Sequence, residues 1–248
     1  MTTALITGAS RGLGRAAALH LAQDGIDVIG TYRSSEAEAD AVATEIHAAG
    51  ARAVMLRYDA EATDADTFAA DLKRALAELG AERLDHLVNN AGVGAHAPFA
   101  ETDLDVLDRM YRIHVRAPYA LTRAVLPMMA DGGRILFVSS GLARFAIPGY
   151  GAYAAMKGAV EVLTRYGATE LGARGIRVNA IAPGAIATDF GGGAVRDNEE
   201  VRGFVSSTIA LGRPGEADDI GGAVAAILSD RMGWLNGERI EVSGGQSI

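Results

Sequence analysis

The chain has 248 residues, of which 49% are hydrophobic, so it is long enough to bury one large core. Its formal net charge of -8, with the basic residues scattered along the chain, is unfavourable for binding a nucleic-acid backbone. It contains no cysteine, which excludes disulfides, thiolate metal sites and thiol catalysis.

The start of the chain lacks the basic residues, long apolar core and cleavage site of a signal peptide. No apolar run approaches the roughly 20 residues that span a bilayer. No proline-rich or serine-rich linker divides the sequence. We therefore expect a cytoplasmic protein without membrane or nucleic-acid partners, folded as one domain over residues 1–248.

Short runs of valine, isoleucine and leucine alternate with alanine-rich stretches of helical spacing. This alternation predicts an α/β fold with a parallel sheet of about seven strands. The runs lack the polar alternation of a one-sided sheet, so we expect helices on both faces. The predicted strands cover residues 4–7, 28–32, 53–58, 86–89, 134–139, 177–181 and 239–242.

A glycine-rich turn follows the first predicted strand and leads into an alanine-rich helix. It reads Thr7-Gly8-Ala9-Ser10-Arg11-Gly12-Leu13-Gly14. Glycines let the backbone approach a pyrophosphate closely, and a helix N-terminus offers free N–H groups and partial positive charge. The spacing differs from the G-x-G-x-x-G fingerprint, and a turn without a ligand is the alternative. We predict a dinucleotide site here.

The end of the second predicted strand indicates which dinucleotide binds. The acidic residue that grips the adenine ribose of NAD is missing there, and Asp27 lies at the opposite end of the strand. Arg33 and Ser34, together with Arg11, can instead hold a 2′-phosphate. We therefore predict a preference for NADP(H) over NAD(H). The alternative is that both arginines are ordinary solvated surface residues.

Tyr153 and Lys157 lie four residues apart in a predicted helix, so their side chains share a face. A neighbouring ammonium is expected to lower the pKa of a phenol from about 10 toward the working range of a proton donor. Ser140, at the carboxyl end of a predicted strand, is placed to hold a carbonyl oxygen, and Ser139 is a competing candidate. The pair alone is a weak signal, because such spacings occur by chance.

Taken together, the motifs resemble in order and spacing those of the classical short-chain dehydrogenases/reductases, closest to the 3-oxoacyl-[acyl-carrier-protein] reductase branch. The resemblance runs from residue 3 to about residue 245. It rests on the glycine turn, Asn89-Asn90-Ala91-Gly92, Ser140, Tyr153-x-x-x-Lys157 and Pro183-Gly184. It implies a doubly wound Rossmann sheet, cofactor and substrate sites in one domain, and a homotetramer.

The resemblance also implies roles for individual residues. Tyr153 would protonate the substrate oxygen, Lys157 would bind the nicotinamide ribose, and Ser140 would orient the carbonyl. Asp59 would meet the adenine, and Ile186 and Thr188 would hold the carboxamide. The cofactor-binding residues would be Gly8, Ser10, Arg11, Gly12, Leu13, Gly14, Arg33, Ser34, Asp59, Ala60, Asn90, Ala91, Gly92, Tyr153, Lys157, Pro183, Gly184, Ile186 and Thr188.

One residue departs from the family pattern. His114 stands where many members carry an asparagine that feeds protons to the tyrosine through a water and the lysine. An imidazole can still form hydrogen bonds, and a pKa near 6.5 would make the relay sensitive to pH. We predict that His114 takes part in catalysis; the alternative is that it only packs in its helix.

The remaining signals concern the substrate. The other histidines show no spacing typical of a metal site, so we expect no catalytic metal. Residues 185–210, with three consecutive glycines and a charged patch, predict a loop with a short helix that covers the substrate as a lid. The family resemblance implies that Phe145, Tyr150, Phe190 and Phe204 surround a moderately apolar substrate pocket, with packing in the core as the alternative for each. His96 is a candidate for the rim of this pocket, but a solvated loop histidine is the favoured interpretation.

We expect a hydride-transferring oxidoreductase, most simply a reductase of a small-molecule or acyl ketone. Arg174 lies at a family position that contacts an acyl carrier protein, but residues 129–132 lack the second basic cluster. Two alternatives remain: an alcohol or sugar dehydrogenase that works oxidatively, and a non-catalytic dinucleotide-binding regulator.

Overall fold

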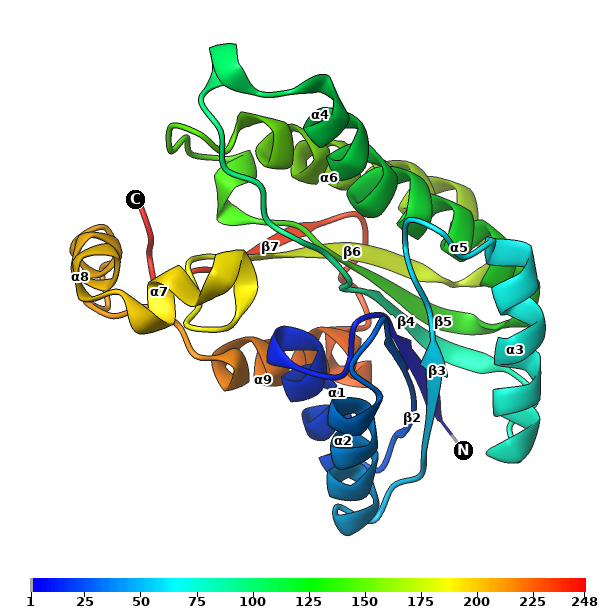
Figure 1. Ribbon diagram of the computed structural model, residues 1–248. Coiled ribbons are helices and arrows are strands. Elements are labelled where there is room, and N and C mark those ends of the chain that lie inside the picture. The colour runs from blue at the N-terminus through cyan, green and yellow to red at the C-terminus, as the bar shows by residue number, and fades with distance from the viewer. Residues whose placement is uncertain (1) are drawn as a thin grey trace.

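The computed structural model describes residues 2–248 and contains one sheet of seven strands in the order β3-β2-β1-β4-β5-β6-β7 (Figure 1). Every neighbouring pair is parallel, which confirms the predicted α/β class. The strands are β1 (Thr3–Ile6), β2 (Asp27–Tyr32), β3 (Ala53–Arg57), β4 (Leu84–Asn89), β5 (Met129–Val138), β6 (Arg177–Pro183) and β7 (Arg239–Val242).

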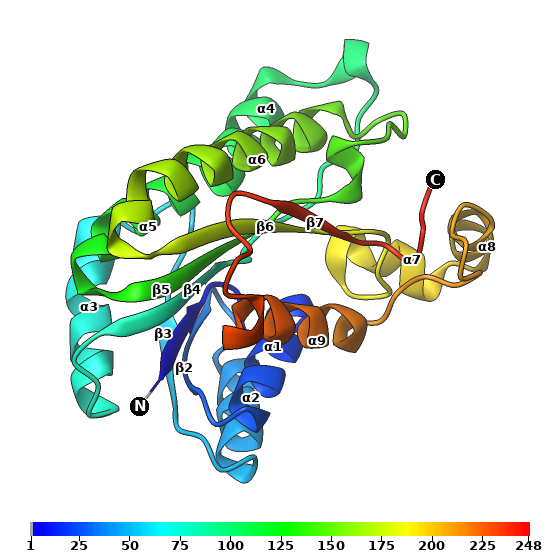
Figure 2. The same cartoon turned by 180° about the vertical axis from the view of Figure 1, so that it is seen from behind.

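Helices cover both faces of the sheet, as the views from the two sides show (Figures 1 and 2). One face carries α1 (Gly12–Gln23), α2 (Glu36–Ala48) and α9 (Ala217–Leu228), and the other carries α3 (Ala65–Glu78), α5 (Ala117–Val125) and α6 (Gly151–Leu171), with α4 (Leu104–Tyr111) packed beside α6.

Alternate residues of one strand enter different cores. Ala4 and Ile6 of β1 pack in the cluster with α1 and α9, whereas Leu5 packs in the cluster with α3 and α5. All three side chains are fully buried. A strand buried on both faces needs apolar residues at every position, which is why the sequence shows no polar alternation.

The strands β4 and β5 begin earlier than predicted. β5 begins at Met129 and not at residue 134, and β4 begins at Leu84 and not at residue 86. The two strands pair at Leu84 and Met129, and the register shifts before they pair again at His86 and Arg134. The polar and glycine-rich residues of this irregular segment hide the strand in the sequence.

The predicted loop at residues 185–210 contains more helix than expected. It holds a 3₁₀ turn (Phe190–Gly193) and two helices, α7 (Ala194–Asp197) and α8 (Glu199–Ser207). The three consecutive glycines all have positive φ, between 63° and 78°. Glycine adopts this backbone conformation without steric cost, so the segment can turn sharply before α7. Its role as a lid stays a prediction.

The strand order reverses between β1 and β4, so the loops after these two strands diverge. In parallel α/β sheets ligands bind in the crevice outside the strands' carboxyl ends at such a point. The glycine turn follows β1 and Asn89-Asn90-Ala91-Gly92 closes β4. Across residues 2–248, none of the helices combines the length and the apolar character needed to cross a membrane.

Candidate active site

The glycine turn between β1 and α1 is held against the end of β4. Gly8 has φ +68° and Gly12 has φ +55°, a region that other residues rarely adopt. Asn90 Nδ2 donates to the carbonyl oxygens of Thr7 (2.8 Å) and Gly8 (3.1 Å). A Cβ at Gly14 would lie 2.1 Å from the Gly8 carbonyl oxygen, so only glycine fits there.

The N-terminus of α1 points into this turn without a side-chain cap. Arg11 is the residue that precedes the helix, and its side chain forms no capping hydrogen bond. The first amides of α1 are therefore available to an anion, and the tight glycine backbone lets a phosphate approach them. The residues present fit the pyrophosphate of a dinucleotide.

Thr7 links the two loops, a role that the sequence did not reveal. Its Oγ1 accepts hydrogen bonds from the backbone amides of Asn90 (2.9 Å) and Ala91 (3.0 Å). Its own hydroxyl faces the carbonyl of Val88. The only hint in the sequence is a hydroxyl residue directly before the glycine turn.

Two exposed basic side chains are candidates for the 2′-phosphate: Arg11 in the glycine turn and Arg33 directly after β2. Among residues 2–248, no carboxylate forms an ion pair with Arg11 or Arg33. Asp27 lies at the other end of β2, where Arg52 donates to it at 2.6 Å. The guanidinium groups are therefore accessible to an anionic ligand, and no carboxylate of β2 opposes one there.

The other expected cofactor residues lie along the same edge of the sheet. Asp59 and Ala60 follow β3, and the Asp59 carboxylate accepts from the amide of Glu61 at 2.9 Å. Thr188, after β6, lies 3.9 Å from the position of a Cβ at Gly12. The loop after β6 thus reaches the glycine turn of β1.

Tyr153 and Lys157 lie on one face of α6, and both are buried. Lys157 Nζ donates to the carbonyl oxygen of Val138 at 2.6 Å and lies 5.6 Å from the centre of the Tyr153 ring. Ser140 follows β5 and is also buried, and its Oγ accepts from the amide of Leu142 at 3.2 Å. The three side chains predicted to be catalytic therefore come together.

The electrostatics differ from the expectation. Burial raises the pKa of Tyr153 above its ordinary value of 10, and a side-chain hydrogen bond with Ser140 lowers this pKa by less. Burial lowers the pKa of Lys157 to about 7. The net shift of the phenol's pKa is opposite to the lowering expected from a neighbouring ammonium, because removal from water is the larger effect. The phenol is kept protonated at neutral pH.

Ser139, the competing candidate, is used differently. Its Oγ donates to Glu161 Oε1 at 2.7 Å and lies 3.3 Å from the carbonyl oxygen of Lys157. The Ser139 hydroxyl is thus bound to Glu161, which lies one helical turn after Lys157 on α6. Ser140 is left as the serine that interacts with Tyr153.

His114 lies in a π-helical turn (Arg112–Arg116) between α4 and α5. Such turns occur frequently at functional sites. Its Nε2 is 2.8 Å from the carbonyl oxygen of Val93, so Nε2 carries the proton and Nδ1 is an acceptor. The imidazole packs edge-on against the Tyr153 ring, with the centroids 5.2 Å apart.

The expectation that His114 titrates near neutral pH is wrong. Burial, reinforced by the charge of Lys157, lowers the pKa of His114 to about 3. The imidazole is therefore neutral throughout the physiological range. Among the described residues, Nδ1 has no hydrogen-bond partner, which leaves one acceptor for a ligand or solvent molecule.

Two buried histidines make the fold sensitive to acid. Burial lowers the pKa of His86 to about 4, and that of His114 to about 3, from an ordinary value of 6.5. Between pH 6.5 and these values only the unfolded chain binds the protons, so stability falls as the pH falls. The loss is several kcal/mol, at about 1.4 kcal/mol for each pKa unit.

We therefore expect the thermal midpoint to fall steeply from pH 6.5 to about pH 4.5, above the range where most carboxylates titrate. His114→Asn should flatten this decline, whereas substitution of the exposed His47 by asparagine should leave it unchanged. Differential scanning fluorimetry at half-unit pH steps measures it. A decline in His114→Asn as steep as in the unmodified chain contradicts this account.

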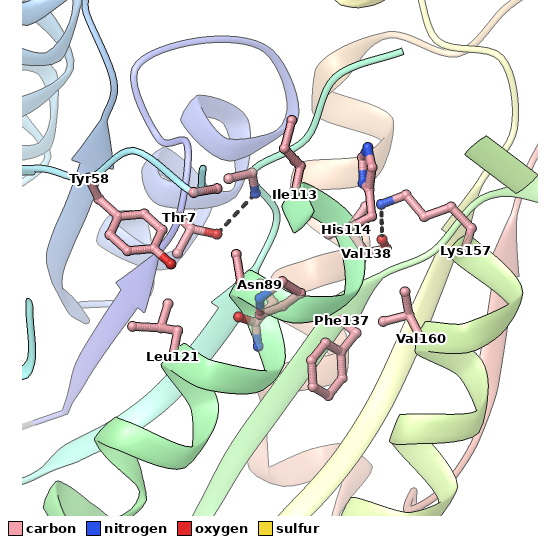
Figure 3. A pocket seen from close by; sticks show the side chains of 14 residues that line it. Thr7, Tyr58, Asn89, Ile113, His114, Leu121, Phe137, Val138, Lys157 and Val160 are labelled. Atoms are coloured by element: carbon pink, nitrogen blue, oxygen red, sulfur yellow. Dashed lines mark hydrogen bonds between the residues drawn. The ribbon is translucent and has the colours of Figure 1, made fainter. Parts of the chain in front are cut away.

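Beneath the catalytic residues is a small internal cavity of about 20 Å³ (Figure 3). Asn89, His114 and Lys157 line it, together with Thr7 and Tyr58. Asn89 Oδ1 is buried without a hydrogen-bond partner among the described residues, as is His114 Nδ1. The volume admits a molecule the size of water but no substrate.

The aromatic residues expected around the substrate lie on several loops and on α8. The Phe190 ring lies 5.7 Å from the Tyr153 ring, and His96 packs edge-on against Tyr150 at 4.9 Å. Phe145 packs beside Gly141, directly after the catalytic serine. Phe204 lies on α8 and is 60% exposed. Phe190 thus lies against Tyr153 and Phe145 lies beside the residue that follows Ser140, whereas a substrate contact of these five residues stays a prediction.

Arg174, considered as a carrier-protein contact, has structural partners. Its guanidinium donates to Asp131 (2.8 Å) and to the carbonyl oxygens of Leu126 (3.0 Å) and Met129 (2.6 Å). These bonds close the end of α5 against the start of β5. The Arg174 guanidinium is thus hydrogen-bonded within its own chain.

Comparisons with known proteins agree with this geometry. The family model described as enoyl-(acyl carrier protein) reductase matches residues 8–247. The chain is 35% identical over 245 residues to the 3-oxoacyl-[acyl-carrier-protein] reductase FabG of Staphylococcus aureus (strain Mu50), covering 98% of this chain and 97% of FabG.

Two solved structures are also similar. The first is LugOII, described as a promiscuous reductase that catalyses keto-reduction at C1 during lugdunomycin biosynthesis, with a TM-score of 0.94, 39% identity and coverage of 100% of this chain and 98% of LugOII. The second is the landomycin C-6 ketoreductase LanV with bound NADP and rabelomycin, with a TM-score of 0.90, 37% identity and coverage of 99% and 96%.

Proposed function

The chain belongs to the short-chain dehydrogenase/reductase family and is an oxidoreductase of C=O and CH–OH groups, and from this premise we propose that it is an NADP(H)-dependent ketoreductase. The observation that carries the proposal is the juxtaposition of Ser140, Tyr153 and Lys157 at the carboxyl edge of the sheet, beside a glycine turn that fits a pyrophosphate.

The proposed cofactor is NADP(H), which when bound supplies the hydride. The glycine turn and the free amides of α1 would hold its pyrophosphate. Arg11, Arg33 and Ser34 would hold the 2′-phosphate, and the remaining residues predicted from the sequence would line the rest of its length. LanV carries bound NADP, which supports this choice.

In ketone reduction a protein acid must protonate the oxygen as the carbonyl carbon is reduced. Tyr153 is suited to this step because burial keeps its phenol protonated. The Ser140 hydroxyl would donate a second hydrogen bond to the same oxygen, where negative charge develops. Once the proton has left, the Lys157 ammonium and the Ser140 hydroxyl would stabilise the phenolate.

His114 is proposed to help return a proton to Tyr153 and Lys157 after each reduction. Its free Nδ1 lines the same cavity as Lys157 and can accept a hydrogen bond from a solvent molecule there. A neutral imidazole can orient such a molecule at any physiological pH. Turnover and the pH–rate profile of the His114→Asn variant test whether the imidazole has a special role: if both are unchanged, it has none, because asparagine is the residue that many family members carry at this position.

The proposed substrate is a bulky, fused-ring ketone. The Phe190 ring against Tyr153 and the His96–Tyr150 pair just before α6 would offer aromatic surfaces against which a flat ring system can stack. LanV binds rabelomycin and LugOII catalyses a keto-reduction in lugdunomycin biosynthesis, which supports the same class. The internal bonds of Arg174 make a carrier-protein substrate less favoured.

Absorbance at the dihydronicotinamide band, followed with purified protein, NADPH and a panel of ketones, tests the proposal. We expect kcat/KM for fused-ring ketones to exceed that for 3-oxoacyl thioesters by at least about tenfold, or about 1.4 kcal/mol. Reduction of the thioesters alone would indicate a carrier-protein reductase. Binding of NADPH without turnover of any carbonyl or alcohol would indicate a regulator.

The cofactor preference has its own test in Arg33→Ala. A charge-assisted hydrogen bond contributes about 1.5–3 kcal/mol, so KM for NADPH should rise about 10- to 100-fold. KM for NADH should stay within about twofold, because NADH lacks the 2′-phosphate, and the NADH series is thus the internal control. Equal KM changes for both cofactors would contradict a phosphate-binding role.

A lid at residues 185–210, a single domain over 1–248, a homotetramer and a cytoplasmic location all remain predictions. Size-exclusion chromatography with light scattering measures the oligomeric state directly. The prediction of a lid is supported by the three glycines with positive φ before α7 and by the contact of Phe190 with Tyr153.

A further inference from the structure

Four charged side chains form a continuous cluster beside the end of β5. Arg239 Nε donates to Glu161 at 2.6 Å and its Nη1 donates to Glu241 at 2.8 Å. Arg144 donates two hydrogen bonds of 2.7 Å to the same Glu241. The side chains of Arg239 and Glu161 are only 22% and 15% exposed, so this pair is largely shielded from water.

The cluster contacts both serines at the end of β5. Arg239 Nη2 donates to the carbonyl oxygen of Ser140 at 3.2 Å, and Glu161 accepts from the hydroxyl of Ser139 at 2.7 Å. Arg239 comes from β7 and Glu161 from α6, so two elements far apart in the sequence hold this dipeptide. None of the bonds involves the Ser140 hydroxyl.

Glu161 also belongs to the face of α6 that carries the catalytic side chains. Tyr153, Lys157 and Glu161 are spaced by four residues, so they lie in a row along the helix. Each meets one residue of the strand end: Tyr153 meets Ser140, Lys157 meets the Val138 carbonyl, and Glu161 meets Ser139. These three contacts fix the strand end against the helix.

We propose that Arg239 and Glu161 are positioning residues that hold the Ser140 hydroxyl at the correct distance and angle from Tyr153. The inference rests on the proposed function. Hydrogen bonds weaken steeply with misalignment, and Ser140 is an extended residue (φ -161°) that leads into a 3₁₀ turn (Gly141–Ala143). Loss of the guanidinium leaves the Ser140 carbonyl with the Ala143 amide (3.1 Å) and leaves the Glu161 carboxylate with the Ser139 hydroxyl, so the link from β7 to the strand end is lost.

The test uses three variants. Arg239→Met removes every bond of the guanidinium but leaves the Glu161 carboxylate buried without its partner, which can by itself unfold the protein. Glu161→Gln/Arg239→Met leaves no unpaired charge at this position and keeps an acceptor for Ser139. Arg239→Lys retains the charge but cannot reach three acceptors in one plane. Arg74→Met, with a 77% exposed side chain on α3, is the matched control.

We expect the double variant to fold, to bind NADPH within about twofold of the unmodified affinity, and to lose about tenfold or more in kcat, a change of about 1.4 kcal/mol in the barrier. Arg239→Lys should recover part of the loss. For alcohol oxidation, the acidic limb of the pH–rate profile should move to higher pH, because the Ser140 hydrogen bond lowers the pKa of Tyr153. A merely structural role would not move this limb.

A folded double variant with unmodified kcat and an unmodified pH profile overturns the inference. Amide hydrogen exchange over residues 139–142 provides a readout without turnover: exchange should be faster in the double variant than in Arg74→Met. If the unmodified chain reduces no ketone, the proposed function fails by itself, and unchanged exchange in the double variant then overturns this inference separately.

Discussion

Tyr153→Phe is expected to lower kcat for ketone reduction by about 10³-fold, within the range that a general acid contributes. The substitution removes one oxygen atom and leaves a ring of the same shape packed against His114 and Phe190. The affinity for NADPH should therefore change by less than about threefold. Steady-state kinetics on a reduced ketone and a fluorescence titration with NADPH measure the two quantities.

Tyr166→Phe is the control for this variant. Tyr166 lies on the same helix and is 65% exposed, and none of the strand-end contacts described above involves it. We expect its kinetics to match those of the unmodified chain. If Tyr153→Phe retains turnover within tenfold of the unmodified chain, another group donates the proton and the assigned chemistry is wrong.

Gly14→Ala is expected to have the second large effect. A Cβ at this position would lie 2.1 Å from the Gly8 carbonyl oxygen and 2.6 Å from Asn90 Nδ2. Backbone cannot move aside as a flexible side chain can, so α1 must shift away from the glycine turn. Overpacking of this kind lowers the free energy of unfolding by about 1–3 kcal/mol. The displaced turn should also weaken NADPH binding by at least about tenfold.

Gly158→Ala is the matched control, since it makes the same change inside a helix. No atom lies within 4 Å of a Cβ at Gly158. Alanine is favoured over glycine in helices by up to about 1 kcal/mol, so this variant should be slightly more stable. Chemical denaturation and a cofactor titration of both variants measure the effects. Equal stability and affinity in the two variants would show that the close packing at Gly14 carries no constraint.

The sequence predicts the fold well because each element has a local cause. Runs of β-branched residues and alanine-rich stretches predict the strands and helices, and the motifs fall at the ends of the strands that the fold brings together. The start of β5 is missed, since Asp131, Gly132 and Gly133 carry no strand signal. That segment becomes a strand only through its pairing with β4, which is a tertiary effect.

The site is predictable only in part. Spacing four residues apart is enough to place Tyr153 and Lys157 on one face, but the pKa of each depends on how much water the folded chain excludes. The buried state of His114 and its low pKa have the same origin. The contacts of Arg239 with Glu161 and Ser140 join β7, α6 and β5, and no local pattern signals them.

Transfer of deuterium from NADPH labelled at C4 of the nicotinamide tests the central claim most directly. The protein is incubated with each diastereomer of the labelled cofactor and a fused-ring ketone, and the alcohol is analysed by mass spectrometry. We expect one deuterium on the carbinol carbon from one diastereomer and none from the other, and about 10³-fold slower formation of the labelled alcohol with Tyr153→Phe. Binding of NADPH without any labelled alcohol from the unmodified chain would contradict a ketoreductase.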